Sequence, residues 1–261
     1  DAIGAFYADW ENLDHNAREL LYTKKMENIY LSNKDDAEAT VFYALALTSS
    51  ADPNDKTYKN QKKAGALLEN LFKEKPNHPG IAHYIIHSYD YPELAQMGLN
   101  TARRYAEIAP ASAHAQHMPS HIFTRLGLWN ESINTNINSA SSAICYAESV
   151  NLEARWTQEI HAVDYLVYAY LQMGDNKNAL EQLNEMQAVK TVFPNDDFAS
   201  AYALTAIPVR VALENKNWKE VANLELPKID FTWGKFSWEK ALLHFGKSLG
   251  YSHIGNIASA E

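Results

Sequence analysis

Residues 78–90 read HPGIAHYIIHSYD and residues 114–129 read HAQHMPSHIFTRLGLW. Within these two stretches, His83 and His87 recur as His117 and His121, each displaced by 34 residues along the chain. A period of this length is typical of repeated units that each contribute two antiparallel helices. One such unit cannot bury its apolar face alone, so neighbouring units have to stack. The recurrence therefore predicts an all-α protein built from repeated helix pairs.

The composition agrees with a folded helical chain. Apolar residues make up 46% of the 261 residues, whereas Gly (10) and Pro (9) are scarce and no strand-like alternation is visible. The formal net charge of −9 argues against nucleic acid as a partner, because phosphate binding requires a basic surface. No apolar run is long enough to cross a bilayer, so no transmembrane segment is expected. The only cysteine, Cys145, is predicted to be a small core residue of a helix.

The whole chain, residues 1–261, is predicted to form one helical-repeat domain. Its clear repeats cover about 36–225, preceded by a helix pair in 1–35 and followed by a loop and a helix in 226–261. The first pair is expected over 2–12 and 15–32, with Asp14 as the N-cap of the second helix. Pro119 and Pro208 fall inside expected helices, where proline kinks or restarts the helix.

The two ends of the chain carry their own expectations. Because the sequence begins with Asp1 and not with Met, we expect that a leader or an upstream segment has been removed, which is compatible with export. No polar cap closes the C-terminal end of the repeats. The alternatives there are a fragment of a longer array or dimerisation through that end.

Specific residues resemble the tetratricopeptide repeat. That family places a small residue, a bulky residue and a proline along the second helix of each unit; Ala64, Leu68 and Pro76 match this pattern, as do Gly98, Ala102 and Pro110. The turns around Gly127 and Gly174 match its central turn, whereas Lys216 stands where the family usually has glycine. The resemblance covers about five units and includes a histidine-rich group of bacterial tetratricopeptide proteins. It implies a right-handed α-solenoid with a concave groove lined by the first helices.

Histidines form stripes on the expected first helices. His83 and His87 are four residues apart and share one helical face, and His114, His117, His121 and Arg125 form a second stripe at spacings of 3, 4 and 4. The next first helix repeats the spacing as His161, Asp164, Tyr168 and Gln172. By the resemblance, the three stripes face the groove side by side.

Three interpretations of this cluster remain open. Neutral imidazole is a common ligand of Zn, Cu and Ni, so His83, His87, His117 and His121 are candidate ligands of one divalent transition metal, with His114, His161 and Asp164 around it. Alternatively, the stripes with Tyr168 and Arg125 form a groove for a peptide or a small ligand. The third alternative is structural hydrogen bonding without a ligand.

Signatures of known enzyme classes are missing from the histidine stretches. Three residues separate the members of each histidine pair, but none of them is the glutamate of the HExxH metalloprotease pattern. The sequence therefore favours a binding module whose groove captures a protein segment or a small ligand. The alternative function is a transition-metal-binding protein or a metal-dependent hydrolase that uses the groove histidines.

Overall fold

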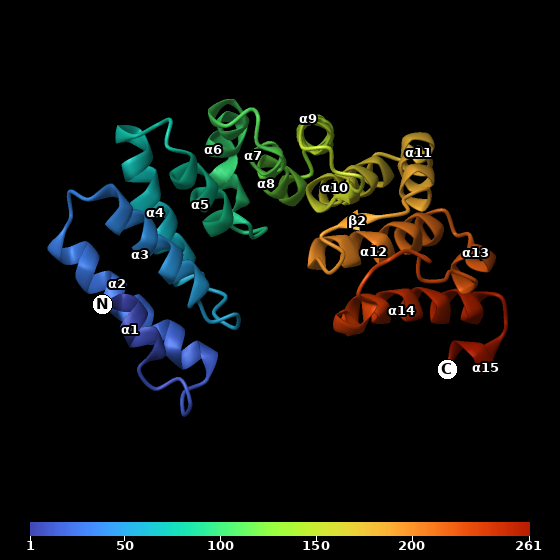
Figure 1. The fold of residues 1–261 in the computed structure, drawn as a ribbon, viewed down its shortest axis with the longest axis horizontal. Helices are drawn as coiled ribbons and strands as arrows, with labels where there is room; N and C mark the ends of the chain where they lie inside the picture. The colour runs from blue at the N-terminus through green and yellow to red at the C-terminus, as the bar shows by residue number, and fades with distance from the viewer. The chain divides into compact units, whose positions relative to one another are not determined.

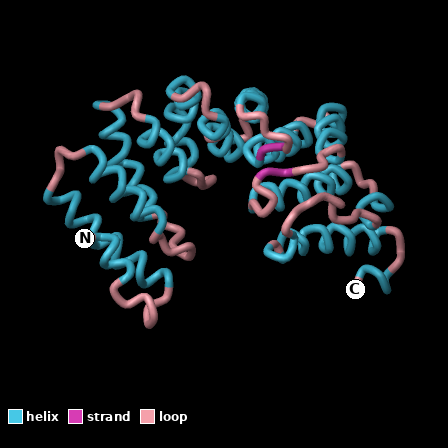
Figure 2. Tube along the Cα trace, in the orientation of Figure 1, coloured by secondary structure: helices cyan, strands magenta, loops and turns pink.

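A computed structural model describes residues 1–261, and helices make up nearly all of its regular structure (Figures 1 and 2). The all-α prediction is confirmed. The exceptions are strands β1 (Arg155–Trp156) and β2 (Val192–Phe193), drawn in magenta in Figure 2, which pair in parallel. The chain divides into two compact units, unit 1 (Asp1–Ala109) and unit 2 (Pro110–Glu261).

In unit 1, each helix packs against the next helix along the chain, and α3 also contacts α5. Its helices are α1 (Ala2–Tyr7), α2 (His15–Ser32), α3 (Ala37–Ser49), α4 (Lys59–Glu74), α5 (Pro79–Tyr89) and α6 (Ala95–Ile108). The predicted helix 2–12 ends early, because the Asp9 side chain and backbone bond Asn12 instead of continuing the helix.

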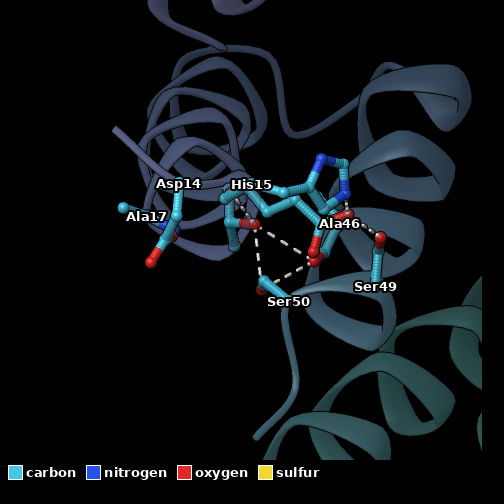
Figure 3. Close-up of polar contacts among 8 residues, drawn as sticks. Asp14, His15, Ala17, Ala46, Ser49 and Ser50 are labelled. Atoms are coloured by element: carbon cyan, nitrogen blue, oxygen red, sulfur yellow. Dashed lines mark hydrogen bonds and ion pairs between the residues drawn. The ribbon is translucent and has the colours of Figure 1, made fainter. Parts of the chain in front are cut away.

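Polar contacts join the first helices of unit 1. The Asp14 carboxylate accepts the Ala17 N–H at 2.8 Å, which confirms the predicted N-cap of α2 (Figure 3). Further along α2, the Glu19 carboxylate contacts His15 at 3.2 Å and accepts the Ser49 hydroxyl of α3 at 2.7 Å. These bonds fix α2 against α3.

In unit 2, helices again contact their neighbours along the chain, and α12 also packs against α10 and α14. Its helices are α7 (Ala113–His117), α8 (Pro119–Leu126), α9 (Trp129–Ser149), α10 (Thr157–Gln172), α11 (Asn176–Gln187), α12 (Phe198–Glu214), α13 (Trp218–Ala222), the 3-10 helix η1 (Trp233–Lys235), α14 (Ser237–His253) and α15 (Ile257–Ala260). Pro119 begins a new helix, whereas Pro208 lies within α12.

The starts of α10 and α12 are tied together. Strand β1 directly precedes α10 and pairs with β2, with Arg155 opposite Val192 and Trp156 opposite Phe193. The Asp197 carboxylate accepts both the Ser200 N–H of its own helix and the Thr157 hydroxyl at the start of α10. Backbone pairing and the shared Asp197 carboxylate therefore hold the first turns of α10 and α12 next to each other.

Five turns that end helices use the left-handed backbone region, and three of them follow α8, α10 and α12. Gly127 after α8 has φ 69° and Gly174 after α10 has φ 72°. Lys216 after α12 has φ 53°, at the position where the sequence resemblance would place a glycine. The backbone thus adopts the same conformation in all three turns, although only glycine does so without steric strain.

Cys145 lies on the surface, so the prediction of a core cysteine is wrong. The buried face of α9 carries Ser132, Asn136, Ser139 and Ala143. Cys145 follows Ala143 by two residues, which turns it to the opposite side of the helix. No helix of the structure has both the length and the apolarity that crossing a membrane requires.

We expect that Gly65→Ala destabilises unit 1. A Cβ at Gly65 would lie 2.2 Å from Cζ of Tyr89, a fully buried side chain of α5. Overpacking of this kind costs about 1–3 kcal/mol and should outweigh the roughly 1 kcal/mol that alanine gains over glycine in a helix. Urea denaturation measures the difference. The control is Gly234→Ala, because no atom lies within 4 Å of its added Cβ; equal stability changes in the two variants would contradict the prediction.

Candidate metal centre

Two of the predicted histidines meet where α7 gives way to α8. His117 is the last residue of α7, and His121 lies in the first turn of α8. Pro119 interrupts the helix, but Met118 between them keeps right-handed helical angles (φ −50°, ψ −39°). The two residues therefore remain one helical turn apart on one face, and their Nε2 atoms lie 3.1 Å apart.

His161 of α10 completes a group of three imidazoles. One ring nitrogen from each of His117, His121 and His161 can be chosen so that all three lie within 4.8 Å of one another. The rings of His117 and His161 are 4.3 Å apart between centroids. Two nitrogens on a tetrahedral metal with bonds of about 2.0–2.1 Å are roughly 3.4 Å apart. An ion would therefore draw His161 inward by about 1 Å, a movement that side-chain torsions allow.

A buried asparagine fixes the tautomer of His117. Asn136 donates its side-chain N–H to the Ser132 carbonyl at 2.7 Å, so its Oδ1 is the atom that faces Nδ1 of His117, also at 2.7 Å. An amide oxygen only accepts hydrogen bonds, so Nδ1 of a neutral His117 carries the proton. Its Nε2 then presents a lone pair toward His121, which is the arrangement that a metal ligand needs.

Tyr165 of α10 packs against the His117–His121 pair. Its ring meets His117 edge-on at a centroid distance of 4.6 Å and His121 at 5.3 Å. Its hydroxyl lies 3.4 Å from Nδ1 of His121. His114 stands beside this group, with its ring stacked on His117 at 6.4 Å. The site therefore has an aromatic wall and a fourth imidazole at its edge.

Loss of solvation favours the neutral form of three of the histidines, His117, His161 and His114. It lowers the pKa of His117 well below the ordinary value, and neighbouring His161 and His121 lower it further. Burial also lowers the pKa of His161 to about 4, although nearby Asp164 opposes the shift. The pKa of His114 is lowered too, mainly by burial. The neutral form is the one that binds metals.

The other members of the α10 stripe are engaged elsewhere. The Asp164 carboxylate accepts a hydrogen bond from Arg210 of α12 at 2.7 Å, and the Arg210 guanidinium lies over the Tyr168 ring at 5.1 Å. Asp164 is 5% exposed, so the ion pair neutralises a buried charge. Asp164 acts on His161 through its charge, and the group of three ligand atoms does not include it.

His83 and His87 belong to unit 1. Their rings are 4.6 Å apart between centroids, and the Tyr105 hydroxyl lies 3.5 Å from Nδ1 of His83. The shared face predicted for this pair is therefore present on α5. A single site made of these two and His117 with His121 would span both units, and it stays a prediction. Arg125, the last member of the second stripe, is exposed on α8.

His117 is only 1% exposed, so the expectation that its whole stripe lines an open groove is wrong for this residue. It faces Asn136 of α9 and Tyr165 of α10 within unit 2. Sequence reasoning also missed Asn136 as a functional residue. A signal existed, because Ser132, Asn136 and Ser139 follow helical spacing of four and three, which puts three polar groups on one face.

The sequence matches no protein-family model, and it matches no curated protein. The function is therefore inferred from the residues of the site.

The metal-free protein should lose stability as the pH falls. An unfolded histidine titrates at about 6.5, whereas the pKa of folded His161 is about 4. Between these values the unfolded chain binds protons that the folded chain does not, so stability is complete above pH 6.5 and declines toward pH 4. For His161 the loss amounts to about 3 kcal/mol. Urea denaturation between pH 7.5 and 4.5 measures this decline.

His161→Gln should flatten this acid dependence, because glutamine does not titrate. His244→Gln is the matched control, since His244 is exposed in the same unit and lies outside the cluster. An NMR titration that places both His117 and His161 at or above pH 6.5 would contradict the prediction.

Proposed function

We propose that this protein binds a divalent transition metal ion through His117, His121 and His161. The observation that carries the proposal is the convergence of three imidazole nitrogens within 4.8 Å, from two segments of the chain. Lowered pKa values keep His117 and His161 in the neutral form that coordinates metals. Three imidazoles suit Zn, Cu and Ni better than the oxygen-seeking Mg and Ca.

His121 has to change tautomer when the ion binds. In the metal-free site, Nε2 of His117 accepts, so Nε2 of His121 is the donor across 3.1 Å. Coordination through the same nitrogen moves that proton to Nδ1. The Tyr165 hydroxyl lies 3.4 Å from Nδ1 and can rotate from donor to acceptor, since a hydroxyl serves both roles. Tyr165 therefore accommodates either tautomer without moving its ring.

Three protein ligands leave a fourth coordination position for another molecule. We propose that a donor atom of a protein segment or a small ligand takes this position, which joins metal binding to the groove-capture hypothesis. His114 and Tyr165 stand beside it. Hydrolysis would also need a general base, but the Asp164 carboxylate is paired with Arg210, and the Asp197 carboxylate accepts bonds from Thr157 and Ser200. Capture of a ligand therefore agrees better with the site than hydrolysis does.

We also propose that the chain is a tetratricopeptide-like solenoid. Successive helices pack against one another within each unit, and the turns after α8, α10 and α12 share left-handed residues. Lys216 supports the proposal most directly, because it adopts at φ 53° the conformation that glycine supplies in the repeat. The groove of such a solenoid would be the surface through which the ligand approaches the ion.

Zn, Cu or Ni should raise the melting temperature of the untagged protein. An ion that binds only the folded chain, at about 100 times its Kd, adds about 2.7 kcal/mol, which corresponds to roughly 5–10 °C in a chain of this size. His117→Ala and His161→Ala should each abolish most of the shift, and the double variant should lose little more, because ligands of one site are not additive. Calorimetric melts with and without each metal make the measurement.

His78→Ala should keep the metal shift, since His78 caps α5 and contacts Glu38 in unit 1. His83→Ala separates the two metal-site hypotheses: an unchanged shift supports three ligands in unit 2, whereas a lost shift supports the four-histidine site. The metal proposal is wrong if none of the three ions shifts the melt of the unsubstituted protein.

Asn136→Ala should weaken metal binding by about 10- to 100-fold, because partners that orient a ligating histidine contribute that much. Competition against a chromogenic chelator measures the affinity. The control is Asn138→Ala, which removes the same side chain from an exposed position of the same helix. Equal affinities in the two variants would show that Asn136 does not orient His117.

A further inference from the structure

A cavity lies in unit 2, in a region that the histidine site does not use. It has a volume of about 370 Å³ and opens between α11, α12 and the segment 224–229 that follows α13. Its walls are mainly apolar: Leu183, Met186, Leu204, Ile207, Leu226 and Ile229. Ligand pockets range from about 300 to 1,000 Å³ and are mostly apolar with a few polar groups. The cavity therefore has the size and the lining of a site for a small molecule.

Pro208 removes one backbone hydrogen bond from the part of α12 that lines the cavity. Proline has no N–H, so it cannot donate to the carbonyl of Leu204 one turn earlier in α12. Leu204 and Pro208 both line the cavity. A buried carbonyl that lacks its helical donor costs free energy until another donor reaches it.

The rim of the cavity carries a local positive charge. Lys190 and Lys228 line it together with Glu225, which pairs with Lys228 at 3.3 Å. Lys190 is exposed, and it also borders a neighbouring hollow that Glu153 and Glu185 line. The charged residues that line the cavity itself are two lysines and one glutamate, on a chain whose net charge is −9. An anionic group at the rim would complement Lys190.

We propose that this cavity binds a small amphipathic carboxylate, with its hydrocarbon body between α11, α12 and the segment 224–229 and its head group beside Lys190. The body covers apolar side chains that otherwise face water, which is favourable in proportion to the area buried. The carboxylate balances the lysine at the rim, where its charge stays hydrated. This site is separate from the metal centre and does not depend on it.

The test compares three probes with the same eight-carbon chain: octanoate, 1-octanol and octylammonium. Isothermal titration calorimetry of the full chain should give the tightest binding for octanoate, weaker binding for 1-octanol and the weakest for octylammonium. Lys190→Ala should weaken octanoate binding about 3- to 10-fold and leave 1-octanol unchanged, because only the anion uses the lysine. Added salt should weaken octanoate binding alone. Lys177→Ala, an exposed lysine of α11 outside the cavity, is the matched control.

Leu226→Trp should abolish binding of all three probes, because the indole fills the cavity from the segment 224–229. Circular dichroism checks that this variant folds; if it does not, the Lys190→Ala comparison decides. Binding of octanoate that survives in a folded Leu226→Trp variant would overturn the proposal, since the probe would then bind elsewhere. Equal affinities for the three head groups, or no binding of any probe, would overturn it as well.

Discussion

A neutral imidazole in the interior has to satisfy both of its ring nitrogens, and His117 imposes this constraint on its surroundings. Nδ1 is satisfied by Asn136, whose own amide is oriented by the Ser132 carbonyl. Nε2 is satisfied by His121. These bonds join α7, α8 and α9, and losing one would leave a polar atom of a 1% exposed residue unpaired, at a cost of about 1–3 kcal/mol.

The same constraint links stability to chemistry. A protonated His117 would have donors on both nitrogens, and it could no longer accept from His121. Burial in unit 2 disfavours the charged form and holds the pKa of His117 well below its ordinary value. A metal ion binds to the lone pairs of neutral imidazoles, so its coordination does not require His117 to be protonated. The feature from which we expect sensitivity to acid is thus also the feature on which the proposed metal binding rests.

Much of the fold could be predicted from the sequence, because helical spacing and caps are local signals. The helix 15–32 with its Asp14 cap is correct to the residue. The 34-residue recurrence predicted that His117 and His121 lie on one face of a helix, as His83 and His87 do. His161 follows His117 by 44 residues, so it does not fit this period. The long helix α9 and strand β1 fill that longer interval. His161 therefore joined the centre through tertiary packing, which no fixed period reveals.

Asn136 and Arg210 illustrate why the partners of the remaining site residues could not be predicted. The polar spacing of Ser132, Asn136 and Ser139 marks a shared face, but each of Asn136 and Arg210 bonds a partner 19 or 46 positions away that local spacing does not identify. The burial of His117 also depends on neighbouring helices, because a helical stripe specifies a shared face and not what covers that face.

The tie between the starts of α10 and α12 gives unit 2 a mechanical property. His161 lies one turn after Thr157, whose hydroxyl bonds the Asp197 carboxylate that caps α12. Displacing the first turn of α12 along its axis would therefore pull the first turn of α10 with it. The third imidazole therefore depends for its place on a capping carboxylate that belongs to another helix.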